Sequence, residues 1–220
     1  MGWTMTRHVL SAAAMAGVLA IALGTLAASR QQPVGLAPLD ASSPITYFIA
    51  DGAGRTGYRP SDRQLAEWAL RAWQRTAPNN LRFVAAPESS ALIRLYWTES
   101  NDGGYGEMQP LLVAGRRGAA LFIQSDVSSL GSDIAQRVKA DDLMRESIVY
   151  LTCLHELGHA LGLEHTRDFR DIMYFFGYGG DVVQYFNRYR AQLHSRNDIP
   201  TVSGMSPADA ARVRAMYSRP

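Results

Sequence analysis

The sequence predicts an α+β fold, and three features of its 220 residues support this. Short runs of β-branched and aromatic residues lie between turn-forming segments, as strands do. Two longer segments, from Ser61 to about Thr76 and from Asp141 to Leu161, carry apolar residues at helical spacing. Near the end, Ser206-Pro207-Ala208-Asp209 has the pattern that opens a helix. With 47% hydrophobic residues, the chain has enough apolar material for one well-packed domain.

The expected strands all precede the long helix. They are Ile45–Ile49, Leu81–Ala85, Ala91–Thr98, Met108–Ala114 and Ala119–Gln124. Met108–Ala114 is expected to form an edge strand. Pro110 removes one amide donor there, and proline on an edge strand is also an ordinary device against aggregation. Ser61 is expected to cap the first helix. The apolar stripe of that helix is Leu65, Trp68 or Ala69, Ala72 and Trp73, and the inner face of the last helix is Ala210, Val213 and Tyr217.

The N-terminus resembles an export segment. Arg7 and His8 precede an uncharged, Ala-rich run at 9–28, and small residues follow it. We therefore expect residues 1–29 to be a cleaved signal peptide. The alternative is an uncleaved membrane anchor, because a run of about 20 residues can span a bilayer. Residues 30–43 are rich in proline and predict a linker, and 44–220 form the domain, which is secreted or tethered at the outer face of the membrane.

Composition limits the partners. A formal net charge of +2, without a basic stripe, gives no support for nucleic-acid binding. Cys153 is the only cysteine, so an intramolecular disulfide is excluded, and we expect Cys153 to be a small core residue. We expect a monomer that meets a membrane only through residues 9–28, if these stay uncleaved.

The most informative stretch is His155-Glu156-Leu157-Gly158-His159-Ala160-Leu161-Gly162-Leu163-Glu164-His165. On a helix, His155 and His159 lie one turn apart on one face, so both can bind one Zn²⁺. Gly162 tolerates the left-handed conformation that ends helices, so the chain can turn back and present His165. Three histidines leave a fourth position for water, as in catalytic zinc sites. Glu156 can reach that water.

This stretch resembles the zinc-binding motif HExxHxxGxxH of the metzincin metallopeptidases, with every fixed position filled. Met173 follows His165 at the distance seen in the matrixin (matrix metalloproteinase-like) branch, which implies a structural Met-turn beneath the imidazoles. The resemblance implies a zincin-like catalytic domain with a twisted mixed β-sheet and three main helices. It also implies an active-site cleft between an N-terminal and a smaller C-terminal subdomain.

The resemblance further implies a zinc metalloendopeptidase that hydrolyses peptide bonds of protein or peptide substrates. One Zn²⁺, bound by His155, His159 and His165, lowers the pKa of a bound water towards neutrality. Glu156 is expected to accept the proton as general base and pass it to the leaving amine. Two alternatives stay open: a non-catalytic binding module stabilised by zinc, and a zinc amidase acting on a non-protein amide.

The chain departs from the matrixin pattern after Met173. Phe175 stands where matrixins have proline, and the aromatic-rich segment 175–203 is longer than the corresponding connection. Tyr174 and Phe175 are expected to form part of the substrate pocket wall. Residues 182–193 have helical spacing and are expected to pack on the domain. There are two alternatives to this packed helix. The segment could form a wall of the pocket beside the scissile bond, or it could lie as a basic amphipathic helix on an anionic membrane surface.

Matrixins also bind a structural zinc and calcium ions. No histidine lies between His8 and His155, so a second zinc site built from imidazoles is excluded. Four acids could in principle bind calcium but show no ligand pattern, and we expect them to be solvated loop residues: Asp102, Glu107, Asp126 and Asp133. We expect His194 to be exposed, and control by a cysteine-bearing propeptide to be absent, because no cysteine precedes Cys153.

Overall fold

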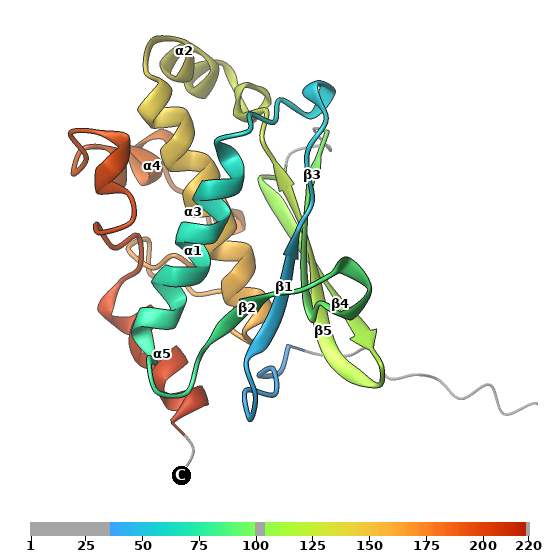
Figure 1. Ribbon diagram of the computed structural model, residues 1–220. Coiled ribbons are helices and arrows are strands. Elements are labelled where there is room, and N and C mark those ends of the chain that lie inside the picture. Colours follow the sequence, from blue (N-terminus) through green and yellow to red (C-terminus); the bar gives the residue numbers. More distant parts are fainter. Residues whose placement is uncertain (1–35, 100–103, 219–220) are drawn as a thin grey trace, which may run out of the picture. The chain divides into compact units, whose positions relative to one another are not determined.

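The computed structural model describes residues 36–99 and 104–218 (Figure 1). The predicted export segment 1–29, the start of the predicted linker 30–43, and Asp102 lie outside these residues. None of the helices in the described ranges has both the length and the apolar character needed to span a bilayer.

The described strands form one mixed sheet in the order β2-β1-β3-β5-β4. Neighbouring strands run parallel except β4, which lies at the edge and runs antiparallel to β5. The α+β fold with a mixed sheet is therefore confirmed, and so is the edge position of the strand that contains Pro110. The strands are β1 (Ile45–Ile49), β2 (Phe83–Ala85), β3 (Ile93–Thr98), β4 (Gly106–Val113) and β5 (Arg116–Gln124).

One face of this sheet carries the core. On β3, Ile93, Leu95 and Trp97 are buried while the residues between them are half-buried, because successive side chains of a strand point to opposite faces. Leu121 and Ile123 extend the apolar surface onto the neighbouring strand β5. Helices α1 (Asp62–Thr76) and α3 (Asp142–Ala160) lie side by side on the same side of the sheet, as Figure 1 shows.

Three further helices are α2 (Ser132–Ala140), α4 (Val182–Arg190) and α5 (Pro207–Tyr217). Helices α1, α3 and α5 confirm the three main helices of the sequence analysis. Helix α4 confirms the helix expected in 182–193, and it packs on the domain because Tyr185, Phe186 and Tyr189 are buried. That burial removes the apolar face that a membrane-surface helix would need. Helix α2 was not predicted, because Ile134 is its only buried residue.

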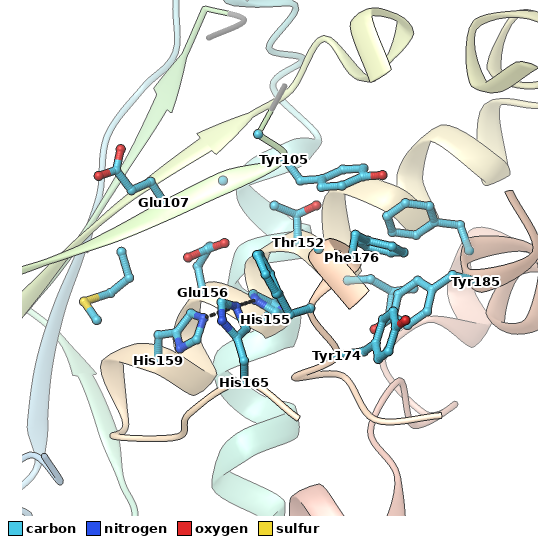
Figure 2. Close-up of a pocket in the computed structure, with 17 residues that line it drawn as sticks. Tyr105, Glu107, Thr152, His155, Glu156, His159, His165, Tyr174, Phe176 and Tyr185 are labelled. Carbon is cyan, nitrogen blue, oxygen red and sulfur yellow. Dashed lines mark hydrogen bonds between the residues drawn. The ribbon is translucent and has the colours of Figure 1, made fainter. Parts of the chain in front are cut away.

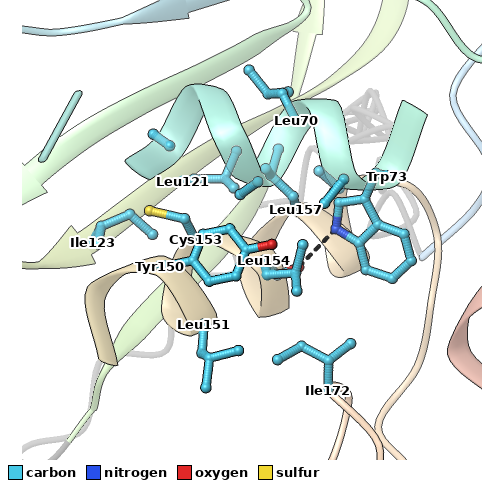
Figure 3. Close-up of a cluster of buried hydrophobic side chains, with 14 of the residues drawn as sticks. Leu70, Trp73, Leu121, Ile123, Tyr150, Leu151, Cys153, Leu154, Leu157 and Ile172 are labelled. Atoms are coloured by element: carbon cyan, nitrogen blue, oxygen red, sulfur yellow. Dashed lines mark hydrogen bonds between the residues drawn. The ribbon is translucent and has the colours of Figure 1, made fainter. Parts of the chain in front are cut away.

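The long helix α3 packs one of its faces into the hydrophobic core (Figure 3). Trp73 of α1 donates its indole N–H to the carbonyl oxygen of Leu154 at 2.9 Å. Cys153 is fully buried, as predicted, and lies beside Ile123 of β5 in Figure 3. With one face of α3 fixed against α1 and the sheet, the face that carries His155 is free to line a cavity.

The start of α1 differs from the prediction. Ser61 precedes the helix, but its side chain makes no capping hydrogen bond. The neighbouring Asp62, the first residue of the helix, is fully buried and accepts the amide N–H of Arg59, which precedes the helix, at 2.9 Å. Its carboxylate also receives two hydrogen bonds from the buried guanidinium of Arg145, at 2.7 and 2.8 Å, which joins α1 to α3.

Two of the acids expected in loops lie in regular elements. Glu107 is an exposed residue of β4, and Asp133 lies in the first turn of α2. Asp126 is in a loop, where its carboxylate accepts the amide N–H of Ser128 at 3.2 Å. All three are exposed, as expected of solvated acids, but the loop position is confirmed only for Asp126 and is wrong for Glu107 and Asp133.

Candidate active site

The last turns of α3 and the chain that follows bring three histidines together. His155 and His159 project from one face of α3, and the helix ends at Ala160. Gly162 then adopts a φ of +102°, as its place after the helix predicted, and the chain returns towards the helix to place His165. The Nε2 atom of His165 lies 3.3 Å from that of His155 and 3.1 Å from that of His159 (Figure 2).

Hydrogen bonds of the Nδ1 atoms determine which ring nitrogens of His155 and His159 face the centre of the three histidines. Nδ1 of His155 lies 2.6 Å from the carbonyl oxygen of Ile172, and Nδ1 of His159 lies 2.8 Å from that of Leu163. A carbonyl only accepts, so each Nδ1 carries the hydrogen and each Nε2 presents a lone pair. Burial, more than any other cause, lowers the pKa of His155 to about 3 and that of His159 to about 4. Both rings are therefore neutral at physiological pH, as metal ligation requires.

This donor set fits a zinc ion. The ligand atoms of His155, His159 and His165 lie within 4.8 Å of one another. Unprotonated nitrogens so close together repel one another unless a cation lies between them. Three imidazoles are a known donor set for catalytic zinc.

Glu156 is placed beside this centre, in the wall of the cavity. Its side chain is only 5% exposed, and burial, with a smaller contribution from the carboxylate of Glu107, raises its pKa to about 8. The edge strand β4 passes directly over it. A Cβ atom built on Gly106 would lie 2.9 Å from Cγ of Glu156 and 3.0 Å from Cγ2 of Thr152, so the absence of a side chain at 106 allows this approach.

Met173 lies behind the metal-binding helix. It is fully buried, and its sulfur contacts Gly158, which lies between the first two histidines on α3. The loop that carries it is held by main-chain hydrogen bonds: the amide of Thr166 donates to the carbonyl of Met173 at 2.8 Å. The amide of Ile172 donates to Asp209 at 2.7 Å. The predicted capping residues Ser206 and Asp209 are present at the start of α5. Through its bond to Ile172, Asp209 also holds the loop 166–173, here called the metal loop, which follows the third histidine.

A cavity of about 450 Å³ opens beside the three histidines. In Figure 2, Thr152 lies between Glu156 and a group of aromatic side chains that line the other end. Sequence reasoning named Tyr174 and Phe175 in this wall, and both line the cavity. It missed the remaining lining side chains, which come from four separate segments: Tyr105, Glu107, Met108, Leu151, Thr152, Phe176, Tyr185 and Phe186.

The two predicted wall residues have different surroundings. Tyr174 is buried and donates its hydroxyl to the carbonyl of Gly179 at 2.8 Å, so it is fixed in the loop. Phe175 is 44% exposed, and its ring stacks on that of His165 with centroids 4.7 Å apart. His194 is exposed, as predicted, and lies outside this site.

The free edge of β4 borders the same cavity. The carbonyl oxygen of Tyr105 accepts the amide N–H of Gln124 at 3.1 Å. Hydrogen-bonded and non-hydrogen-bonded pairs alternate along an antiparallel ladder, so the next pair, Gly106 and Ile123, is not hydrogen-bonded. The N–H and C=O of Gly106 and Met108 therefore point away from the sheet, towards open space. Pro110 follows at the same parity, so its missing donor costs the sheet no hydrogen bond.

Comparisons with known proteins find one matching family and similar solved structures. The family model described as Matrixin matches residues 41–181, which is more than half of the chain. Among solved structures, a crystal structure of myroilysin is 18% identical, with 86% of this chain and 89% of that chain covered and a TM-score of 0.41. A second structure of myroilysin is also 18% identical, with 83% of each chain covered and a TM-score of 0.40.

No curated protein matches the sequence. The family match alone is sufficient to assign the chain: it belongs to the matrixin family, and it is a zinc metalloendopeptidase of the metzincin type.

Proposed function

We propose that the protein hydrolyses peptide bonds of protein or peptide substrates, with His155, His159 and His165 as zinc ligands and Glu156 as general base. The observation that carries this proposal is the convergence of three Nε2 atoms at one end of a cavity whose wall contains Glu156. A closed structural site usually has four protein ligands, whereas this cluster has three.

Zinc, when bound, supplies a Lewis acid that polarises a carbonyl and makes water acidic enough to give up a proton near pH 7. The protein does the rest. The carbonyls of Ile172 and Leu163 hold two of the imidazoles in the tautomer that leaves Nε2 free. In the zinc-loaded protein the nearby positive charge would favour the ionised form of Glu156. Its carboxylate takes the proton from the attacking water and delivers it to the nitrogen of the leaving amine.

Substrate binding uses the edge of β4 and the cavity. An extended peptide can pair with the outward N–H and C=O groups of Gly106 and Met108, and this pairing loses one hydrogen bond at Pro110. The cavity end beyond Thr152 is lined by aromatic and aliphatic side chains. It therefore suits an uncharged side chain next to the scissile bond, with Tyr174 and Phe175 in its wall.

Export completes the proposal. Residues 1–29 would direct the domain at 44–220 out of the cytoplasm, either as a cleaved signal or as an anchor. Fractionation of cells expressing the full chain, followed by N-terminal sequencing of the mature protein, tests this. Recovery of the uncleaved chain in the cytosol would overturn it.

Activity on a broad peptide library tests the chemistry. Zinc-loaded protein should cut internal peptide bonds, a chelator should abolish cleavage, and Glu156→Gln should lower kcat/KM by about 100-fold or more. Glu164→Gln is the matched control, because Glu164 belongs to the same stretch but is exposed. Stoichiometric zinc without any cleavage would instead favour the binding module, and cleavage restricted to non-peptide amides would favour the amidase.

A further inference from the structure

Helix α4 comes after residue 181, where the family match ends, yet it contributes to the cavity beside the histidines. Tyr185 and Phe186 are each only 3% exposed although they line that cavity, so the end formed by α4 is closed to solvent. The matched segment therefore does not contain all of the residues that shape the pocket.

Aromatic rings from three segments meet at this closed end. The ring centroid of Phe186 lies 5.3 Å from that of Tyr105, at the start of β4, and 6.2 Å from that of Phe176. Tyr105 and Phe176 are themselves 5.3 Å apart. In Figure 2, Tyr105, Phe176 and Tyr185 lie on the far side of Thr152 from the three histidines. A side chain that enters beside Glu156 and passes Thr152 meets these rings.

The two aromatic residues of α4 are held differently. Tyr185 donates its hydroxyl to the carbonyl of Asp171 at 2.9 Å, so it also stabilises the loop before Met173. Phe186 has no polar side-chain group, and its ring lies near those of Tyr105, Phe176 and Tyr185, so changing its size alters the space without breaking a side-chain hydrogen bond. Phe186 is therefore the residue through which the length of the pocket can be changed.

The chemistry of the closed end selects the kind of side chain. Burial raises the pKa of Tyr105 to about 12, so its hydroxyl stays neutral at physiological pH. The side chains that line the cavity beyond Thr152 are aromatic or aliphatic. A charged side chain in this space would lose its hydration without a partner, which is costly, whereas an apolar one gains from burial.

We propose that Phe186, together with Tyr105, closes the substrate pocket and sets the greatest length of the apolar side chain accepted next to the scissile bond. This inference rests on the proposed function and makes α4 a specificity element. Residues such as leucine and phenylalanine fit in front of the ring of Phe186. A side chain with a second ring in line meets it.

The test compares peptides that differ at one position beside the cleaved bond, with alanine, leucine, phenylalanine or 4-phenylphenylalanine there. Phe186→Ala should raise the kcat/KM ratio of 4-phenylphenylalanine to phenylalanine by about 10-fold or more, since filling or removing a few methylenes of a pocket changes selectivity by that factor. Phe186→Trp should lower the ratio of phenylalanine to alanine. Phe186→Leu, a smaller change, should give an intermediate widening.

Phe169→Ala is the matched control. Phe169 packs on Tyr185, with ring centroids 5.5 Å apart, but it does not line the cavity. It should lower Tm without changing either ratio. Ratios that stay within two-fold of wild type in folded, zinc-containing Phe186 variants would overturn the proposal. An equal shift in Phe169→Ala would also overturn it, because the effect would then be a general loosening.

Binding separates this inference from the proposed catalysis. The same peptides are titrated by calorimetry into zinc-loaded Glu156→Gln protein, with and without Phe186→Ala. If wild type cleaves nothing but the Kd ratio shifts by about 10-fold in favour of the longer side chain, the catalytic proposal fails and the pocket assignment stands. If peptides are cleaved and neither the Kd ratio nor the kcat/KM ratio moves, the pocket assignment fails alone.

Discussion

Nδ1 of His155 lies 2.6 Å from the carbonyl oxygen of Ile172, and this contact links the metal-binding helix to the C-terminal helix. The amide N–H of the same residue, Ile172, donates to the carboxylate of Asp209 at 2.7 Å. Asp209 also accepts the amide of Ser206 and so caps α5. One buried carboxylate therefore holds the main chain that orients the first histidine.

The first prediction concerns this carboxylate. Asp209→Ala should weaken zinc binding by about 10-fold or more, because residues that orient a metal-binding histidine typically contribute this much. Asp198→Ala is the control. Asp198 forms the same kind of capping box with Ser195, but it is only half-buried, and its carboxylate accepts only the nearby amides of His194 and Ser195. Competition titration with a chelator measures both affinities. Equal zinc affinities in the two variants would show that Asp209 serves only to cap α5.

A second prediction follows from the approach of β4 to Glu156. A methyl group at position 106 would lie within 3.0 Å of the Glu156 side chain and of Thr152, so one of them must move. Gly106→Ala should therefore lower kcat/KM by about 10-fold while zinc content stays at wild-type level. Gly104→Ala serves as the control, since its nearest neighbour would be 3.7 Å away. A wild-type rate for Gly106→Ala would contradict the role given to this contact.

The local part of the site could be predicted from the sequence because it depends on spacing alone. His155 and His159 are one helical turn apart, and Gly162 supplies the left-handed turn that His165 needs. Contacts between distant segments could not be predicted in this way. Tyr105 and Phe186 are far apart in the chain, and only the packing of α4 brings their rings to 5.3 Å.

In the fold, too, the features set by local sequence could be predicted, and those that depend on distant residues could not. The limits of β1 follow from five consecutive apolar or β-branched residues, Ile45–Ile49, and the structure has the strand at those positions. At the start of α1, a rule based on side-chain type predicts a cap from Ser61, whereas Ser61 makes no capping hydrogen bond and the neighbouring Asp62 is buried. Arg145, 83 positions along the chain, pairs with Asp62, and no local pattern reveals that partner.

The third prediction concerns this buried ion pair. Asp62→Asn or Arg145→Met should each lower the free energy of unfolding by about 3–5 kcal/mol, because each leaves a buried charge without its partner. The double variant should cost less than the sum of the two single variants. Arg59→Met removes the exposed pair with Asp142 and should change stability by less than about 1 kcal/mol. Urea denaturation measures all four. Additive single effects would mean that the two charges are not coupled.

The fourth prediction concerns pH and Asp171, which lies in the metal loop. Burial tends to raise the pKa of Asp171, but hydrogen bonds from Ser206 and Arg212 outweigh it and hold the pKa below its ordinary value of 3.8. A carboxyl whose pKa is lowered by folding stabilises the protein fully above its ordinary pKa. That stabilisation is lost as the pH falls through the lowered pKa.

Asp171→Asn should therefore destabilise the protein by about 2 kcal/mol at pH 7, the size expected for hydrogen bonds to a charged group. The difference from wild type should shrink as the pH falls below about 4, because wild type then loses the same interactions. Asp168→Asn is the control. Asp168 pairs with Arg170 on the surface, where solvent screens the pair, so its loss should change stability only slightly at every pH. Chemical denaturation from about pH 7, where the carboxyl is ionised, down to about pH 2.5, below its ordinary pKa, measures the effect. A difference that stays constant across this range would show that the Asp171 carboxylate does not stabilise the fold through its charge.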